Sequence, residues 1–307
     1  MIAAYVCTFA LLLGISAGRM IYLHRHQGQG PSDTVARFFT ALRDNRAAAA
    51  LAELASPPPS TRFITDDVLR AGHQDQPIGN ISVPVTTALV VPVTYTLGQE
   101  TVTDTISLTP VGSGFKIITA VNTGGIPVGS QRRPGLPASL AGVEITDDVA
   151  FLLPGNYPLT TPTPHLAYGR SKTVTVKRLA DTLPASDFAP QLTTAGRTAV
   201  TGAATASLTA CATQHSFAPA GCPFRLSGGV TTTADPAGST WTVLSAPPAD
   251  MKIVLGADLT KSTVEVPLSM RITFPPGTNP PALDLPRTQA IGRVNLLDKE
   301  PTIVWTG

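Results

Sequence analysis

The first 23 residues set the strongest constraint on how this chain can fold. Residues 2–23 read IAAYVCTFALLLGISAGRMIYL and hold one charge, Arg19, near the end of the run. A helix of this length spans about 33 Å, enough to cross the ~30 Å hydrocarbon core of a bilayer, and Arg19 is near enough to the end to reach the interface. The sequence therefore predicts a transmembrane anchor and juxtamembrane segment over residues 1–27.

The same segment has a second interpretation, a cleavable signal peptide with Ser16-Ala17-Gly18 at the cleavage site. The lack of a basic residue before the apolar run and the length of the run favour the uncleaved anchor. Within the anchor, Ala10, Gly14 and Gly18 recur every four residues. This stripe of small residues predicts a surface for helix association, although such stripes also arise by chance in apolar segments rich in Gly and Ala.

Of the three cysteines, Cys7 lies in the apolar run, and Cys211 and Cys222 form a pair eleven positions apart. A disulfide closing this short loop would stabilise the fold by roughly 3 kcal/mol in an oxidising compartment. The alternatives are two free buried thiols, or a metal site with His215. The metal site would need further ligands, and no second Cys or His motif supplies them.

The charge pattern and the cysteine pair disagree about the side of the membrane. His24, Arg25 and His26 follow the apolar run, and the positive-inside rule places such a flank, with the large portion of the chain, in the cytoplasm. The predicted disulfide instead favours the extracytoplasmic side. We expect the extracytoplasmic side; one hypothesis that reconciles the two signals is a natural start further upstream, with basic residues of its own.

The composition narrows the function classes. The chain has 307 residues, of which 43% are hydrophobic and 14% charged, with a net charge of +2. A nearly neutral chain without a cluster of Lys and Arg is not typical of a nucleic-acid binder. Its 29 prolines and 26 glycines favour short strands joined by turns.

The pattern after the anchor predicts an α+β domain over residues 31–127. Ser32 is placed to cap an amphipathic helix of about 23 residues that ends before Pro57-Pro58-Pro59, and a short helix over Thr65–Ala71 follows. From Ile81 the period changes to two, which predicts three or four antiparallel strands with turns at Gly98 and at residues 112–114. A helix covering the apolar face of an antiparallel sheet is the expected result.

The order PSDTVARFFTALRDNRAAAALAELASP, a short helix, then VPVTYTLGQETVTDTISLTPVGSGFKI resembles the NTF2-like (cystatin-like) folds of membrane-anchored exported proteins of high-GC bacteria. The resemblance covers residues 31–121 and rests on the element order, the ARFFTAL opening and the closing GFKI strand. The later LPGNYPL and GCPF stretches are similar to the same proteins. The family implies a fold but no single activity, because such folds host enzymes, ligand pockets and structural modules of secretion and conjugation assemblies.

Residues 128–140 are rich in Gly and Pro and predict a linker, followed by a β-rich α+β domain over residues 141–307. In that domain we expect strands around a Pro154-Gly155-Asn156 turn, a helix over Thr193–Thr213, and a run of antiparallel strands after the cysteines. Helix followed by sheet repeats the order of the first domain, so the second domain is predicted to be a diverged NTF2-like unit as well.

Few residues carry a chemical signal. The chain lacks the dinucleotide, P-loop, zincin and nucleophile-elbow motifs. The acid–base candidates are His73 with Asp75, and Tyr95 or Asp104 on the sheet, against the alternative that His73 and Asp75 are solvated in a polar loop. Asp66-Asp67 and Asp147-Asp148 could pair on a metal, but acidic residues at helix or turn starts are the simpler interpretation. We therefore assign no catalytic, cofactor or metal residue.

Two functions remain as predictions. The first is a non-catalytic, single-pass envelope protein whose domains contact other envelope proteins, or further copies of the chain, outside the membrane. The second is a small-molecule binding, hydrolytic or isomerising domain with an apolar cup lined by Phe38, Tyr95 and Phe115. A deep cup with converging polar groups would favour the second, and a filled cup would argue against it.

Overall fold

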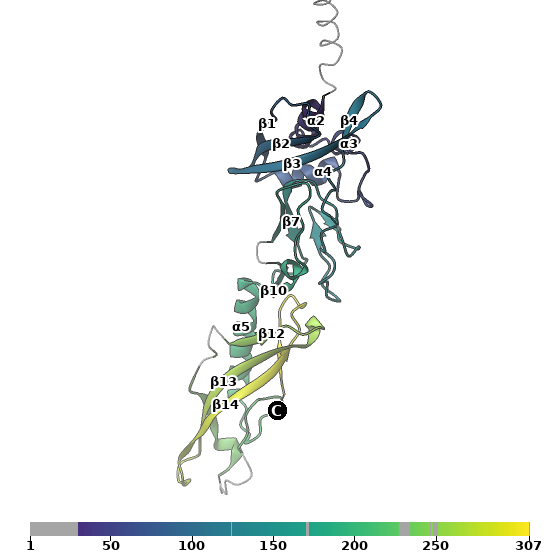
Figure 1. Ribbon diagram of the computed structural model, residues 1–307. Helices are drawn as coiled ribbons and strands as arrows, with labels where there is room; N and C mark the ends of the chain where they lie inside the picture. The colour runs from purple at the N-terminus through teal and green to yellow at the C-terminus, as the bar shows by residue number, and fades with distance from the viewer. Residues whose placement is uncertain are drawn as a thin grey trace, which may run out of the picture.

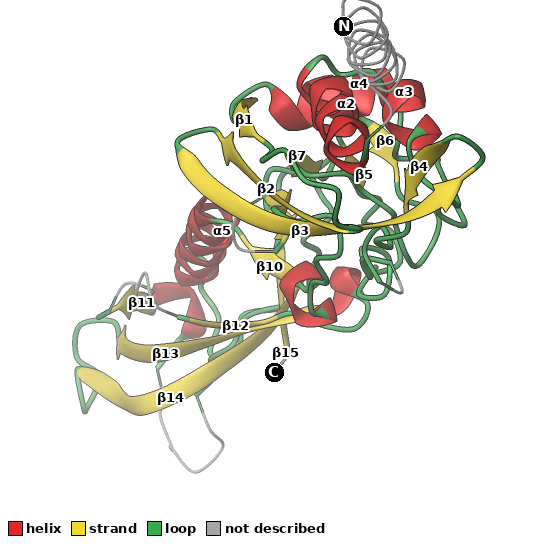
Figure 2. Cartoon of the chain, turned by 45° about the horizontal axis from the view of Figure 1, so that its top comes forward, coloured by secondary structure: helices red, strands yellow, loops and turns green. Residues whose placement is uncertain are grey.

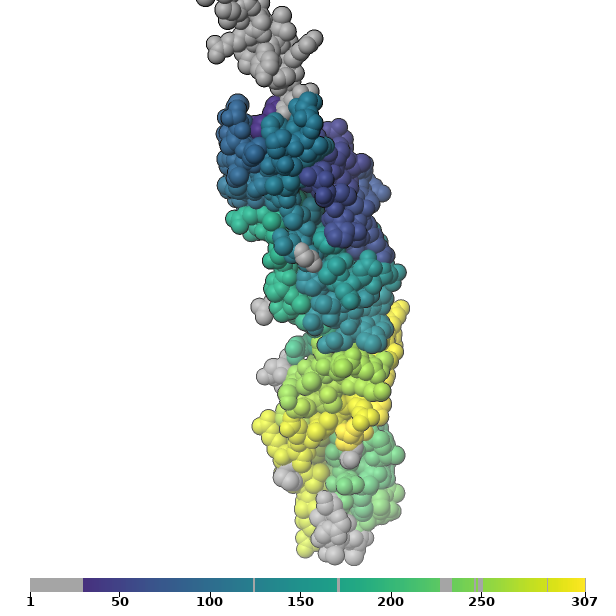
Figure 3. Space-filling view, turned by 45° about the vertical axis from the view of Figure 1, so that its right-hand side comes forward, coloured from purple at the N-terminus to yellow at the C-terminus, as the bar shows by residue number. Residues whose placement is uncertain are grey.

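The computed structural model describes residues 30–123, 125–169, 172–226, 234–245, 247 and 251–306. Over these residues the protein is an elongated α+β structure built mostly from antiparallel sheets (Figure 1, Figure 3). Helix α2 (Pro31–Arg43) lies at one end, and the hairpin of β13 (Ser262–Thr273) and β14 (Ala282–Val294) extends to the other (Figure 1). Within these ranges no helix is both long and apolar enough to cross a membrane. The predicted anchor, with Ala10, Gly14 and Gly18, lies outside the described residues.

We divide the described chain into a first region (30–121), a middle region (122–192) and a distal region (193–306). The first region begins with three helices: α2, α3 (Ala47–Ala52) and α4 (Asp66–His73). The prediction of one continuous helix is wrong, because Asn45 has a φ of 54° and separates α2 from α3. The side chain of Asp66 then caps α3, with its Oδ1 accepting a hydrogen bond from the Ala47 N–H at 2.7 Å.

The sequence predicted the N-cap of α4 correctly and the N-cap of α2 wrongly. Thr65 caps α4 as predicted, and its Oγ1 accepts from the Val68 N–H. Ser32 does not cap α2. The N-cap is Gly30, whose N–H donates to Asp33 Oδ2 at 3.0 Å, so that Ser32 lies inside the helix with its hydroxyl free to bind elsewhere in the fold.

The first sheet has the order β1-β2-β3-β4, and each neighbouring pair is antiparallel. Its strands are β1 (Ile78–Ser82), β2 (Val90–Leu97), β3 (Glu100–Val111) and β4 (Gly114–Ile117). The predicted turns are present, since Gly98 and Gly112 have φ values of 61° and 58° that favour glycine. Helix α2 lies across the sheet and contacts β1, β2 and β4, which matches the predicted helix-on-sheet arrangement (Figure 2).

The middle region consists of short strands. One sheet has the order β6-β5-β7-β9, and a two-stranded sheet pairs β8 with β10. The strands are β5 (Ser139–Leu140), β6 (Val143–Glu144), β7 (Gly155–Thr160), β8 (Leu166–Tyr168), β9 (Thr173–Val176) and β10 (Pro190–Leu192), with a short 3-10 helix at Ala185–Phe188.

One expectation for this region needs correction. Gly155 and Asn156 do not form a turn, because they begin strand β7 and pair with Val176 and Thr175. Residues 128–140, the predicted linker, pack against the core. Four of their side chains are buried in the core, namely Val128, Leu136, Ala138 and Leu140.

In the distal region, α5 (Thr194–Ala212) coincides closely with its predicted bounds. Its buried positions recur every three or four residues: Gly196, Val200, Ala204, Leu208 and Cys211. The helix contacts β11 and β15 of a five-stranded antiparallel sheet in which β13 pairs with β11, β12 and β14, and β14 pairs with β15. The remaining strands of that sheet are β11 (Thr240–Val243), β12 (Lys252–Val254) and β15 (Ile303–Thr306), with short 3-10 helices at Pro236–Gly238 and Leu259–Lys261.

Candidate functional site

The proposed apolar cup is filled by its own side chains. Phe38 and Tyr95 are fully buried, and Phe39 packs between them with ring centroids 5.3 Å from Phe38 and 4.7 Å from Tyr95. Phe115 packs against the same core. The aromatic residues that the sequence suggested as a ligand pocket therefore form the hydrophobic core between α2 and the sheet.

His73 lies in the buried face of α4, so the interpretation of a solvated polar loop is wrong for this residue. Its Nδ1 is 2.7 Å from the Asn45 side-chain oxygen, and its Nε2 is 2.9 Å from the Pro154 carbonyl oxygen. Burial lowers the pKa of the imidazole. Both partners are oxygen acceptors, and a neutral imidazole carries one N–H, so the neutral ring donates to one of these two oxygens. Asp75 is exposed, and no hydrogen bond joins it to His73.

Tyr95 and Asp104 fasten the middle region to the first sheet. The Tyr95 hydroxyl donates to the Lys177 carbonyl, and Asp104 Oδ2 accepts from the Leu179 N–H at 3.0 Å. Burial, reinforced by the nearby Asp104 carboxylate, raises the pKa of Tyr95. Both groups have partners in the middle region, and these two hydrogen bonds hold residues 177–181 against the first sheet.

A buried asparagine at the start of the middle region braces the residues that meet the first sheet. Asn122 is fully buried with a φ of 41°; its Oδ1 accepts from the Leu152 N–H at 2.6 Å, and its own N–H donates to the Leu179 carbonyl at 2.8 Å. Leu179 in turn belongs to the core of the first region, whereas Val68 of α4 belongs to the core of the middle and distal regions. The two hydrophobic cores therefore interlock where the first and middle regions meet, a contact that we call the joint.

The acidic pairs do not converge. Asp66 caps α3, while Asp67 forms an ion pair with Arg70. Asp148 lies 3.3 Å from Arg132 in another ion pair, and Asp147 accepts from Thr146. Among the described residues no group of three or more His, Cys, Asp or Glu side chains could hold a metal ion.

An apolar cavity of about 560 Å³ opens elsewhere in the first region. Its walls include the Pro57–Pro59 loop, residues 117–121 at and after the end of β4, and Phe151 of the middle region, and no charged side chain lines it. The three prolines predicted the end of a helix but gave no sign of a cavity, because the opposite wall comes from residues more than 50 positions later.

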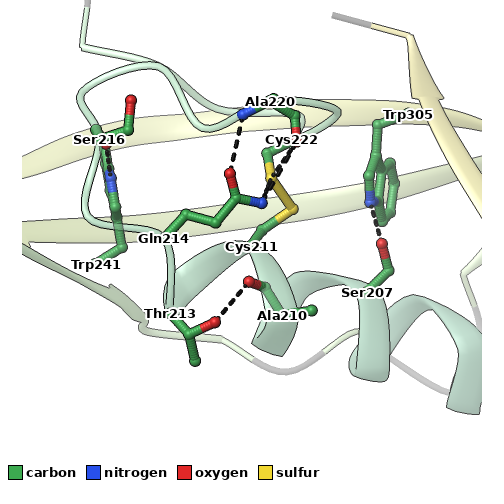
Figure 4. The surroundings of a disulfide bond; sticks show 10 residues. All are labelled: Ser207, Ala210, Cys211, Thr213, Gln214, Ser216, Ala220, Cys222, Trp241 and Trp305. Atoms are coloured by element: carbon green, nitrogen blue, oxygen red, sulfur yellow. Dashed lines mark hydrogen bonds between the residues drawn. A yellow bond between two sulfur atoms is a disulfide. The ribbon is translucent and has the colours of Figure 1, made fainter.

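The distal region contains the predicted disulfide. The sulfur atoms of Cys211 and Cys222 are bonded at 2.07 Å, which links the last turn of α5 to the following loop (Figure 4). Gln214 holds that loop closed, since its Oε1 accepts from the Ala220 N–H at 3.0 Å and its Nε2 donates to the Ala220 carbonyl at 3.4 Å. We call residues 211–226 the disulfide loop.

Aromatic residues fix the disulfide loop against the sheet. Trp241 of β11 donates from Nε1 to the Ser216 carbonyl at 2.7 Å (Figure 4), and its ring packs on Phe224 at 4.8 Å between centroids. Phe217 meets Phe274, at the end of β13, edge to face at 6.1 Å. The loop is therefore a packed part of the distal region and presents a defined surface.

A cavity of about 380 Å³ lies between the disulfide loop and strands β14 and β15. Phe224, Ile291 and the Cys222 side chain give it apolar walls, and the exposed Arg225 is at its rim. Sequence reasoning identified the cysteines but missed this cavity, because its second wall is formed by strands about 70 residues further along the chain.

Together these features define the chain as an α+β protein of mostly antiparallel sheets, in which His73, Tyr95 and Asp104 bind other parts of the fold. Comparisons with protein-family models, with curated proteins and with solved structures found no match to this chain.

Proposed function

We propose that this chain is a membrane-anchored, extracytoplasmic envelope protein without catalytic activity, which holds its distal region away from the membrane for contact with partner proteins. One observation carries the proposal: the described chain is elongated, with the start of α2 at one end and the distal hairpin of β13 and β14 toward the other (Figure 1). The apolar run at residues 2–23 precedes α2 in the sequence, so the anchor and the distal region would be at opposite ends.

Two further features support this role. The interlocked joint at Asn122, Tyr95 and Asp104 favours a stiff connection over a flexible tether. The Cys211–Cys222 disulfide fits an oxidising compartment and therefore the outer side of the membrane. We also propose that the chain belongs with the NTF2-like exported proteins and acts in a secretion or conjugation assembly. These two parts of the proposal rest on the sequence resemblance alone.

Thiol labelling in intact cells tests the compartment. A membrane-impermeant maleimide is applied to cells that make the full chain with Cys7→Ala, with and without prior reduction. Labelling only after reduction is the expected result. Labelling that requires cell lysis but no reduction would place the cysteines, as free thiols, in the cytoplasm and would refute the proposal.

The contact surface can be tested by photo-crosslinking in the same cells. A photoreactive side chain at Ile291, which is 43% exposed beside the disulfide loop, should give a discrete adduct with an envelope protein or with a second copy of the chain. Val111, 51% exposed on the first sheet, is the matched control position. Equal adduct patterns from both positions would count against a dedicated distal contact surface.

The cavity beside Pro57–Pro59 supports one alternative, the binding of a small apolar ligand, at a different place from the predicted cup. Substitution of Ala120 by Trp would fill this cavity. Loss of a co-purifying apolar compound in that variant, detected by mass spectrometry of the extracted protein, would favour the alternative.

A further inference from the structure

The connection between β1 and β2, together with the first residue of β2, exposes apolar side chains to solvent. Val85 is fully exposed, and Leu89 and Val90 are 43% and 54% exposed. The surrounding segment, residues 76–99, reads QPIGNISVPVTTALVVPVTYTLGQ and contains no Asp, Glu, Lys or Arg. We call residues 83–90 the apolar loop. An exposed, uncharged loop of this kind costs hydration free energy unless something covers it.

The apolar loop is fastened to the first turn of α2. The Ser32 hydroxyl donates to the Pro84 carbonyl at 2.9 Å and accepts from the Thr86 N–H at 2.8 Å. This is the role that Ser32 takes up in place of capping the helix. The loop is therefore held beside Gly30, at the point where the described chain begins.

The length of chain before Gly30 limits how far this face can be from the anchor. Seven Cα–Cα steps separate Leu23, the last residue of the apolar run, from Gly30. Fully extended, such a segment covers at most about 25 Å. If residues 2–23 span the bilayer, the start of α2 and the apolar loop beside it must lie close to the membrane surface.

We infer that the apolar loop inserts Val85 and its neighbours into the interface of the lipid bilayer, as a second attachment beside the anchor. This inference rests on the membrane anchor of the proposed function. The partner is the boundary between headgroups and acyl chains, because an uncharged loop has no group to recognise an anionic headgroup. The contact fixes the tilt of the elongated protein on its anchor.

Fluorescence of a tryptophan placed in the loop tests this inference. Full-length Val85→Trp protein is reconstituted in phosphatidylcholine vesicles with or without brominated acyl chains, which quench only tryptophans in contact with them. The natural Trp241 and Trp305 lie in the distal region, and wild-type protein measures their contribution. Val304→Trp, at a position 67% exposed on β15, is the matched control.

We expect brominated lipid to remove most of the emission that Val85→Trp adds over wild type, and to leave that of Val304→Trp unchanged. The loss should be the same with and without anionic lipid. If the protein floats with the vesicles but the Val85→Trp emission is not quenched, the inference is overturned and the anchor stands. The same holds if the unquenched emission is shifted to the blue by burial against a second copy of the chain. Protein that does not float with the vesicles overturns both.

Discussion

Substitution of Gly72 by Ala offers a direct test of the packing between α4 and the middle region. A Cβ atom built on Gly72 would lie 2.5 Å from Cε1 and 2.7 Å from Cδ1 of Tyr157. The Tyr157 ring cannot easily retreat. It is fully buried, its hydroxyl donates to the Leu153 carbonyl at 2.7 Å, and a Cβ on Gly155 would meet the same ring at 2.9 Å.

Two opposing effects set the size of the change. Overpacking of a rigid core costs about 1–3 kcal/mol, whereas replacing a helical glycine by alanine gains up to about 1 kcal/mol. Because the contact is far below van der Waals distance, we expect overpacking to prevail and Gly72→Ala to lower the free energy of unfolding by about 1–2 kcal/mol. Urea unfolding of the full chain in detergent, followed by circular dichroism, measures the loss.

Gly202 supplies the matched control, because it is also a helical glycine but a Cβ added there would have no atom within 4 Å. Gly202→Ala should therefore raise stability by up to about 1 kcal/mol. A Tyr157→Leu substitution should reduce the cost of Gly72→Ala in a double-mutant cycle. If Gly72→Ala were as stable as wild type, the assigned position of the Tyr157 ring against α4 would be refuted.

Two other substitutions test the distal loop and the joint. Cys211→Ser with Cys222→Ser should lower the free energy of unfolding in urea by about 3 kcal/mol, because the closed loop is released, and reduction of wild type should give the same loss. Unchanged stability would contradict the stabilising role assigned to the disulfide. His73→Gln tests the buried imidazole, whose pKa in the folded state is below the ordinary 6.5. Protonation then favours unfolding, so the stability from the neutral ring is complete above about pH 6.5 and is lost as the pH falls toward the lowered folded pKa. Urea midpoints of wild type should fall over this pH window more steeply than those of His73→Gln, and parallel curves would contradict the assignment.

The sequence was most informative where a local pattern decides the structure. The bounds of α5 follow from the Thr193 cap and a stretch of small helix-forming residues, and the β2–β3 hairpin follows from alternation around Gly98. The short spacing of Cys211 and Cys222 likewise predicted the disulfide between them. In each case the residues that determine the element are close together in the chain.

Features that depend on distant partners were missed. The break between α2 and α3 is stabilised by Asp66, and the burial of His73 depends on Pro154, 81 residues away. The segment 128–140 has the composition of a linker, but burial of its four apolar side chains outweighs that composition. No local pattern in the sequence predicts such long-range contacts. Both cavities were missed for the same reason, because their walls come from residues far apart in the chain.

The joint also has a consequence for biogenesis. Tyr95 and Asp104 find their partners in Lys177 and Leu179, which are synthesised 82 and 75 residues later. At the usual rate of about 5–20 residues per second, these partners are synthesised roughly 4–16 s after Asp104 and Tyr95. A nascent chain of about 127 residues already contains all four strands of that sheet, but it would leave the Asp104 carboxylate and the Tyr95 hydroxyl without these partners. The first region therefore reaches its final form only when the middle region has emerged and folded against it.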